Sequence, residues 1–338
     1  MVSLAVTAAA FLIVGGLIAA RLLFGWRARA RSAERARLVP LLLTADGSQD
    51  ARAQLWRAAD FTADLMVELI QMVRGRERER FIERAAALGV PERLRHHLGD
   101  ASPRVRQTAA EALGLFPDDR SVARLTEALG DPNSDVRLTA ALALAQAGRA
   151  PPLEELVERL DIGRSERSLL IVSLMKELAR HAPGEVEAAL ARADWRGGVR
   201  TAAAEALADA GRYEAVPLIA EAAARAADGS EELPRYLSAL ATLGHPAARP
   251  TVERALASAV AGVRAAGARA AGKIRLNDLG GRLAELLADP AWIVRYQAGN
   301  ALVALGPAGV RRLDEAVREA QDPAAATARR VLAELGPR

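Results

Sequence analysis

Cysteine is absent from the 338 residues of the sequence, which excludes a disulfide framework, a thiol nucleophile and any thiolate metal site. Aromatic residues make up only 4% of the chain, so a core has to rest on many small contacts rather than on a few large ones. No segment shows the strict alternation of apolar and polar residues that predicts a β-strand. We therefore expect a chain built from helices.

Residues that carry catalysis or bind metals are also sparse. Of the four histidines, His96 and His97 point to different sides of any helix, and His181 and His245 fall where turns are expected. None has the spacing to other ligands that a metal site needs. The sequence contains no P-loop, G-x-G-x-x-G fingerprint, G-x-S-x-G elbow or H-E-x-x-H motif. We predict no catalytic residue, no cofactor and no metal site, and hence a protein that is not an enzyme.

What the chain does contain is a recurring segment. "DPNSDVRLTAALALAQAG" (131–148) resembles "DWRGGVRTAAAEALADAG" (194–211) and "DPAWIVRYQAGNALVALG" (289–306). If the valine of "VR" is taken as the origin, equivalent segments follow one another every 30 to 33 residues. The origins are Val105, Val136, Arg167, Val199, Glu232, Val263, Val294 and Ala324. A fixed period of this length is typical of a repeat array, whose units cannot bury their apolar faces alone.

Each unit predicts two helices. Positions 0, 4 and 8 after the origin are mostly apolar or small and lie on one stripe of a helix. A preceding segment such as "SVARLTEALGDP" (121–132) has apolar residues at helical spacing and ends at Gly, Asp or Pro. We expect about eight such units in residues 100–338, preceded by capping helices in 55–99, because the end units of an array need an atypical outer face.

Two helices per unit, with an Asp near the turn between them and "VR" opening the second helix, resemble the HEAT-repeat family, especially its short bacterial, phycobilin-lyase-like form. The resemblance covers roughly residues 77–338. It implies an all-α, right-handed α-solenoid in which Asp and Arg form a ladder that links successive units. An Arg in the first turn of a helix faces the positive end of the helix dipole, so its recurrence requires a nearby anion. The expected structural ladder comprises Asp100, Arg106, Asp131, Arg137, Asp194, Arg200, Asp289 and Arg295.

Some units depart from the ladder pattern. Ser168 and Leu233 replace the arginine, and Arg264 has no aspartate at the matching place. We expect the ladder to be weakened at these units.

The N-terminal segment predicts a membrane anchor. Residues 2–20, "VSLAVTAAAFLIVGGLIAA", are 19 residues without a charge, which at about 1.5 Å per residue span roughly the thickness of a hydrocarbon core. A cleaved signal peptide is the alternative, but no Lys or Arg precedes Arg21 and no A-x-A spacing follows. We expect residues 1–26 to form a transmembrane signal-anchor helix and residues 27–54 a basic juxtamembrane segment and linker.

The charges around this anchor predict its orientation. Residues 1–37 contain six arginines and one glutamate, so the positive-inside rule places the N-terminus outside and the repeats in the cytoplasm of a bacterial inner membrane. Arginines between Arg27 and Arg37 could also contact anionic lipid. Gly15, Gly16, Ala19 and Ala20 have a small-xxx-small spacing that lets transmembrane helices approach closely.

The basic composition of the chain belongs to this end. The net charge is +4, but residues 38–338 contain 40 basic and 41 acidic residues. A basic surface that would bind nucleic acid is therefore not indicated for the array.

A partner surface is expected on the second helix of each unit, because in the resembling family these helices line the concave side. The columns two and six places after each origin should face solvent. There Leu138, Leu142 and Leu169 would form an apolar patch with acidic residues at its rim. The alternative is that these leucines are core residues. The candidate partner surface comprises Glu111, Leu138, Leu142, Leu169, Glu205, Tyr296 and Asn300.

Three functions fit the sequence. The favoured one is a membrane-anchored scaffold or accessory subunit that binds an integral membrane protein, and the resemblance suggests a membrane glycosyltransferase or polysaccharide synthase as a client. The second is a HEAT-like protein that binds nucleic acid or excises bases, which the near-neutral array and the anchor disfavour. The third is a lyase acting on a tetrapyrrole–protein adduct, against which the lack of a histidine or cysteine cluster counts.

Overall fold

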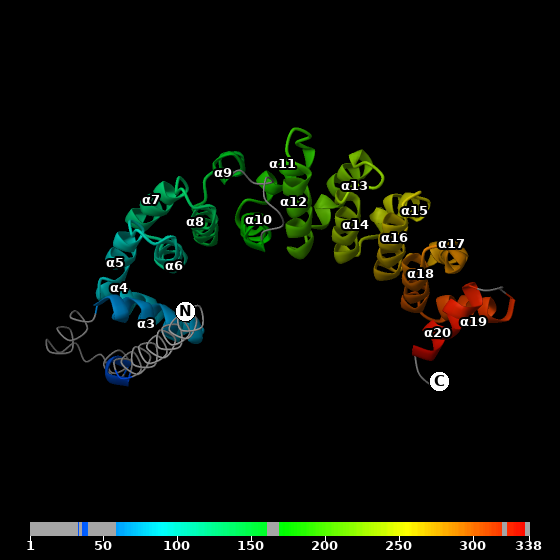
Figure 1. The fold of residues 1–338 in the computed structure, drawn as a ribbon, viewed down its shortest axis with the longest axis horizontal. Helices are drawn as coiled ribbons and strands as arrows, with labels where there is room; N and C mark the ends of the chain where they lie inside the picture. Colours follow the sequence, from blue (N-terminus) through cyan, green and yellow to red (C-terminus); the bar gives the residue numbers. More distant parts are fainter. Residues whose placement is uncertain (1–32, 34–35, 40–58, 161–168, 320–322, 335–338) are drawn as a thin grey trace, which may run out of the picture. The chain divides into compact units, whose positions relative to one another are not determined.

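The computed structural model describes residues 33, 36–39, 59–160, 169–319 and 323–334, and every regular element in these ranges is a helix (Figure 1). The predicted all-α class is confirmed for this part of the chain. The predicted anchor, with Gly15, Gly16, Ala19 and Ala20, lies outside the described residues, as does most of 27–54. Where the chain is described, no helix has the length and apolar character needed to cross a membrane.

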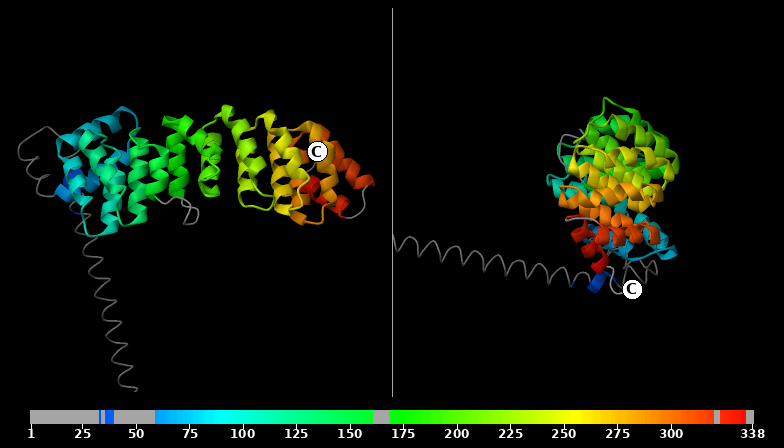
Figure 2. Two further views of the ribbon diagram at one scale, coloured as in Figure 1. Left: turned by 90° about the horizontal axis from the view of Figure 1, so that it is seen from above. Right: turned by 90° about the vertical axis from the view of Figure 1, so that its right-hand side faces the viewer.

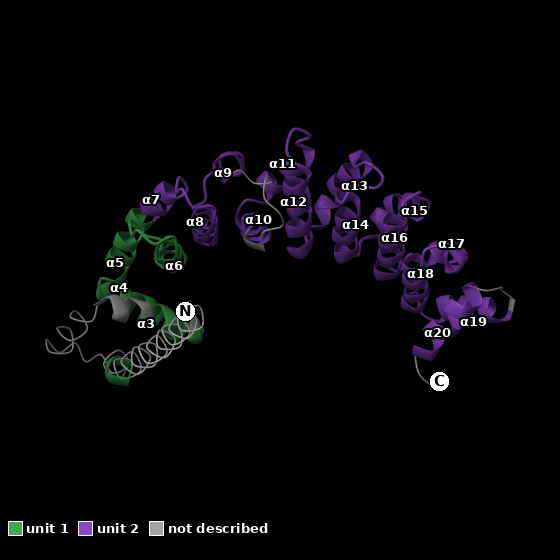
Figure 3. Cartoon of the chain, viewed as in Figure 1, with its two compact units in different colours: residues 1–121 green, residues 122–338 purple. Residues whose placement is uncertain are grey.

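The chain divides into two compact units, residues 1–121 and 122–338 (Figure 3). In unit 1, α3 packs on α4 and α5, and α5 packs on α6. Among the described residues, unit 1 includes α3 (Ala59–Met72), α4 (Arg76–Ala87), α5 (Val90–His97) and α6 (Pro103–Leu113), and α7 (Asp119–Ala128) begins in unit 1 and continues into unit 2. Gly89 separates α4 from α5 at φ 75°, a left-handed conformation that glycine adopts without steric cost.

Unit 2 consists of helix pairs that stand side by side in two layers (Figures 1 and 2). The second helices of the pairs are α8 (Ser134–Gln146), α10 (Leu169–His181), α12 (Gly197–Asp209), α14 (Glu232–Leu243), α16 (Ala261–Ile274), α18 (Trp292–Ala304) and α20 (Ala324–Glu334). The first helices are α9 (Leu153–Leu160), α11 (Pro183–Ala191), α13 (Val216–Arg225), α15 (Arg249–Leu256), α17 (Gly280–Glu285) and α19 (Pro307–Glu319). Short 3-10 turns adjoin α13, α15 and α17: η1 (Tyr213–Ala215), η2 (Pro246–Ala248), η3 (Asn277–Leu279) and η4 (Leu286–Ala288).

Each second helix of unit 2 packs against the next one, from α8 through to α20. This arrangement is an α-solenoid, in which each pair contacts its neighbours along one direction. Seven of the eight predicted origins lie on second helices, and the eighth, Arg167, falls outside the described residues. The right-handed sense of the array stays a prediction.

The core of the array follows the predicted columns. The residues four and eight places after the origins are buried in most units, for example Ala140 and Leu144 in α8 and Ala298 and Leu302 in α18. Small residues in these columns bring neighbouring second helices very close together. A Cβ atom added to Gly272 of α16 would lie 2.7 Å from the Cα atom of Ala301 in α18. The array is therefore held together partly by backbones in direct contact.

Candidate functional site

The recurring arginine of the second helices binds backbone carbonyl groups in the turn before its own helix. In α8, one Nη atom of Arg137 donates to the carbonyl oxygens of Asp131 at 2.9 Å and Pro132 at 3.3 Å. Arg106 makes the same pair of bonds to Asp100 and Ala101, and Arg295 makes it to Asp289 and Pro290. The six-residue spacing between Asp and Arg thus reflects a hydrogen bond to the backbone of the aspartate.

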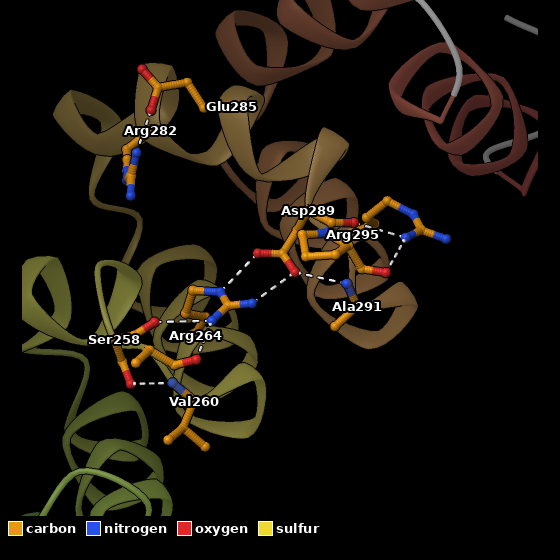
Figure 4. A network of polar contacts seen from close by, with 10 residues as sticks. Ser258, Val260, Arg264, Arg282, Glu285, Asp289, Ala291 and Arg295 are labelled. Carbon is orange, nitrogen blue, oxygen red and sulfur yellow. Dashed lines mark hydrogen bonds and ion pairs between the residues drawn. The ribbon is translucent and has the colours of Figure 1, made fainter.

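The carboxylate of the aspartate makes different contacts, as Asp289 shows (Figure 4). One oxygen accepts from the backbone N–H of Ala291 at 2.9 Å and from Nη2 of Arg264 at 2.9 Å, and the other accepts from Nε of Arg264 at 2.7 Å. Arg264 belongs to the preceding unit, so this pair joins two successive units with two parallel bonds.

The expectation of a weak ladder at Arg264 is therefore wrong. Its carboxylate partner comes from the turn of the next unit and not from six residues before it, where Ser258 and Ala259 supply carbonyl oxygens. Burial raises the pKa of Asp289, but the hydrogen bonds from Arg264 and from the N–H of Ala291 outweigh this effect. The pKa of Asp289 is lowered, and its side chain, 6% exposed, stays ionised in the solenoid.

At Arg200, the ion pair that joins two successive units is made with a glutamate instead of an aspartate. Nη1 of Arg200 donates to the carbonyl oxygen of Trp195 at 2.7 Å, and Nη2 donates to the carboxylate of Glu232 at 3.1 Å. Alanine occupies position 227, which corresponds to Asp289 in the next unit. Any side chain at Gly197 would displace the Glu232 carboxylate, because a Cβ atom there would overlap it. Sequence reasoning missed Glu232, although this glutamate stands at an origin where most units have valine.

Asp194, the remaining aspartate of the predicted ladder, makes no hydrogen bond with Arg200. It accepts two hydrogen bonds from Arg192, at 2.9 and 2.8 Å, which lower the pKa of its carboxyl group. Arg192 also donates to Glu154 of the preceding pair and lies over the ring of Trp195, 4.8 Å from the ring centroid. Because the side chain of Asp194 is 64% exposed, solvent screens this contact strongly.

The predicted apolar patch is not exposed as expected. Leu138 is only 8% exposed and Leu142 is half-buried, while the side chain of Leu169 lies outside the described part of the chain. The column two places after the origin is buried in α8, α12 and α16, since Thr201 and Ala265 are buried like Leu138. Leu138 is a core residue, so the alternative interpretation holds for it.

The remaining candidate surface residues lie in three places. Glu111 is exposed on α6 of unit 1, and Glu205 of α12 is half-buried. Glu205 accepts two hydrogen bonds from Arg235 of α14, at 2.7 and 2.9 Å. Tyr296 and Asn300 lie half-buried on α18. Within unit 2, the described candidates are therefore spread over α8, α12 and α18.

An exposed aromatic residue that the sequence interpretation passed over stands next to Tyr296. Trp292, at the start of α18, is 66% exposed, and its ring centroid lies 6.4 Å from that of Tyr296. On the neighbouring helix α16, Arg269 and Lys273 are exposed. The signal was present in the sequence, because Trp292, Tyr296 and Asn300 recur every four residues and so share one face of a helix.

Other features of the described residues are weaker candidates for a binding site. A cavity of about 380 Å³ lies between α13, α15 and the turns that follow them. Half of its twelve lining residues are alanines, and Ser258 there donates its hydroxyl to Asp228. Within the described ranges, no three His, Asp or Glu side chains are grouped so that they could hold a metal ion.

Comparison with known proteins supports the fold. Residues 91–175 match the family profile described as HEAT repeats. The solved structure of Kap121p bound to Pho4p is similar, with a TM-score of 0.51 and 14% identity over 88% of this chain and 39% of that chain. The chain thus spans about two fifths of the length of this karyopherin. No curated protein matches the chain in sequence.

Two smaller structures are less similar. The CpcE–CpcF complex of phycocyanin lyase from Nostoc sp. PCC7120 has a TM-score of 0.32 and 20% identity, covering 72% of this chain and 94% of that chain. Human deoxyhypusine hydroxylase has a TM-score of 0.33 and 22% identity, covering 74% and 99%. At these identities the likeness concerns the fold alone. Residues 91–175 match HEAT repeats, and the described helices of unit 2 form a HEAT-like α-solenoid.

Proposed function

We propose that the protein is a non-enzymatic scaffold that binds a protein partner on the second-helix layer of its solenoid. The observation that carries the proposal is the exposed face of α16 and α18, where Trp292 stands beside exposed cations. A solenoid presents a long surface without a closed pocket, which suits the binding of another polypeptide. The similar Kap121p structure contains such a partner, Pho4p.

The membrane part of the proposal rests on the sequence. The uncharged run at 2–20 and the arginines that follow it support a single span with the N-terminus outside and the array in the cytoplasm. The partner is then an integral protein of the bacterial inner membrane, with a glycosyltransferase or polysaccharide synthase as one client suggested by the resemblance to HEAT proteins.

Purification of the tagged full-length protein from membranes in mild detergent tests the proposal. We expect a membrane protein to be recovered in stoichiometric amount. When a cross-linker is added before purification, this protein should be linked to the second helices. Recovery of nucleic acid instead would support the nucleic-acid-binding alternative, and a coloured adduct would support the tetrapyrrole lyase. Recovery of the protein alone would contradict the scaffold function.

Because the chain has no cysteine, its topology can be tested with single introduced thiols. A Ser48→Cys variant should react with a membrane-impermeant thiol reagent only after lysis, whereas a cysteine inserted directly after Met1 should react in intact cells. Labelling of Ser48→Cys in intact cells would contradict the cytoplasmic location.

A further inference from the structure

Three neighbouring second helices present one outward stripe each at the C-terminal end of unit 2. The residues of each stripe recur every four positions and so lie on one face of their helix. We call the three stripes together the outward face; it comprises Arg269 and Lys273 of α16, Trp292, Tyr296 and Asn300 of α18, and Ala326, Arg330 and Glu334 of α20. Since α18 packs against both α16 and α20, the three stripes are adjacent.

The outward face is basic. The helices α16, α18 and α20 together contain six basic residues and one acidic residue, Glu334. Arg264 and Arg295 have their guanidinium groups bound in the turns of the ladder. Arg269 and Lys273 differ, because neither makes a hydrogen bond or ion pair with any residue that the structure describes. They are one helical turn apart and thus form a pair of free cations.

The third cation of the face, Arg330, is held only loosely. Its Nε lies 3.4 Å from the carboxylate of Glu334, and the two side chains are 77% and 48% exposed. An exposed pair of this kind contributes little, so a ligand with a better-placed carboxylate can replace Glu334.

The aromatic pair gives the face an apolar centre between these cations. Trp292 and Tyr296 lie on the middle helix, with Arg269 and Lys273 on one side and Arg330 on the other. An exposed tryptophan bordered by polar groups is typical of protein interfaces, where tryptophan and arginine provide most of the binding energy. Asn300, four residues after Tyr296, adds an amide that can both donate to and accept from a peptide backbone.

The geometry points to an extended acidic polypeptide segment with an aromatic or large apolar side chain as the ligand of the outward face. Its carboxylates bind Arg269, Lys273 and Arg330, and its apolar side chain packs on Trp292 and Tyr296. Three helices at roughly 10 Å spacing are crossed by about nine extended residues. This inference rests on the proposed scaffold function and specifies the chemistry of the partner.

Charge along the layer favours a peptide over nucleic acid. A nucleic acid strand carries a charge at every phosphate and needs a continuous basic track. Among the described second helices of unit 2, the cations that make no hydrogen bond or ion pair are Arg269 and Lys273 of the outward face, whereas the stripe of α12 presents Glu205 and Asp209. A short acidic segment fits such a limited patch.

The test uses the purified full-length protein in mild detergent and fluorescence anisotropy. The probes are labelled peptides of about nine residues, each rich in glutamate with one Trp, Phe or Leu at varied positions. Matched peptides carry glutamine for glutamate or alanine for the apolar residue, and a labelled oligodeoxythymidine represents nucleic acid. We expect the acidic apolar peptides to bind at least about tenfold more tightly than either matched set.

Variants assign the binding to the outward face. Arg269→Glu with Lys273→Glu should weaken the best peptide at least about tenfold, while Arg311→Glu with Arg318→Glu, the same charge change on α19 of the other layer, should leave it unchanged. Trp292→Ala should weaken peptide binding as well. The control is Tyr213→Ala, which removes another exposed aromatic side chain, next to α13. Far-UV circular dichroism confirms that each variant is folded.

Three outcomes would overturn the inference. The acidic peptides could bind no more tightly than their glutamine counterparts, or the α19 control variant could lose as much peptide affinity as the α16 variant. The third is tighter binding of the oligonucleotide through the same residues. The scaffold function is judged separately. If the charge-reversed protein still recovers its membrane partner in full, the outward face is wrong but the scaffold stands; if the wild-type protein recovers none, the scaffold itself fails.

Discussion

The second helices α8, α10 and α12 at the start of unit 2 keep their charges balanced, whereas α16, α18 and α20 at its end do not. The first three contain four basic and four acidic residues, and the last three contain six and one. At the start, the charges bridge neighbouring helices: Lys176 binds Asp209 at 2.6 Å, and Glu205 binds Arg235 of α14. At the end, small residues such as Gly272 bring the helices together, and Arg269 and Lys273 of α16 make no ion pair with any described residue.

The difference shows that one repeated unit can meet two requirements. Every unit must bury its apolar columns against its neighbours, and this holds in both regions. The outward positions are not used for burial, so their charges can either pair across a joint or remain available to a ligand. Exposed pairs stabilise a protein only slightly, so the end of the array loses little stability by leaving its cations unpaired.

Separating α16 from α18, whose backbones are in direct contact at Gly272, should reduce the stability of the array most. Gly272→Leu places a side chain against the backbone of Ala301, where even a Cβ atom would lie 2.7 Å from the Cα atom, and should destabilise the array by about 3 kcal/mol. The measurement is the urea midpoint followed by far-UV circular dichroism. Gly262→Leu on the same helix, where no atom lies within 4 Å of an added Cβ, should instead stabilise by up to about 1 kcal/mol. Equal midpoints for the two variants would contradict the close joint.

Breaking the ladder contact between Arg264 and Asp289 should cause the second largest loss of stability. Asp289→Ala leaves the guanidinium of Arg264 without its carboxylate in a site where both side chains are largely buried, so we expect a loss of about 2 kcal/mol. Asp194→Ala is the matched control, because its carboxylate is mostly exposed, so its removal should shift the denaturation midpoint much less than Asp289→Ala does. Chemical denaturation of both variants separates the two aspartates. Similar losses would restore the view that all four aspartates of the predicted ladder serve alike.

Acid should weaken the same joint. The pKa of Asp289 is below its ordinary value of 3.8 in the folded protein, so the unfolded chain binds this proton more readily. The contribution of Asp289 to stability is therefore complete above that value and is lost as the pH falls through the lowered pKa. Urea midpoints at a series of pH values should fall more steeply for the wild-type protein than for Asp289→Asn. Parallel curves would show that the pKa of Asp289 is not lowered.

Removing the charges at outward positions should change the stability of the array least, and the change should differ between the start and the end of unit 2. A double-mutant cycle of Glu205→Gln and Arg235→Gln should give a coupling free energy of about 0.5 kcal/mol. Arg269→Gln should leave the midpoint unchanged, because Arg269 has no partner among the described residues. A clear loss of stability for Arg269→Gln would remove the contrast between the two regions.

The helix pairs could be predicted because apolar or small residues recur at the positions of Ala140 and Leu144 in most units, and this recurrence is a local pattern. It did not predict the partner of Arg264, since the contact with Asp289 joins two units and sequence spacing shows only what lies within one. Leu138 was misplaced for a similar reason: whether its column faces solvent or the next helix depends on how the helices pack. Glu232 and Trp292 were visible as departures from the repeat, but a departure alone does not indicate its role.

The direct contact of Gly272 with Ala301 also affects how the outward face responds to a ligand. Helices that meet through long side chains can shift as those side chains change rotamer, whereas two backbones in contact have no rotamers to exchange. The contact between α16 and α18 is therefore rigid, and the backbone positions of Arg269 and Trp292 are fixed relative to each other. A ligand that binds there loses little entropy in ordering the protein, so its affinity depends mainly on its own flexibility.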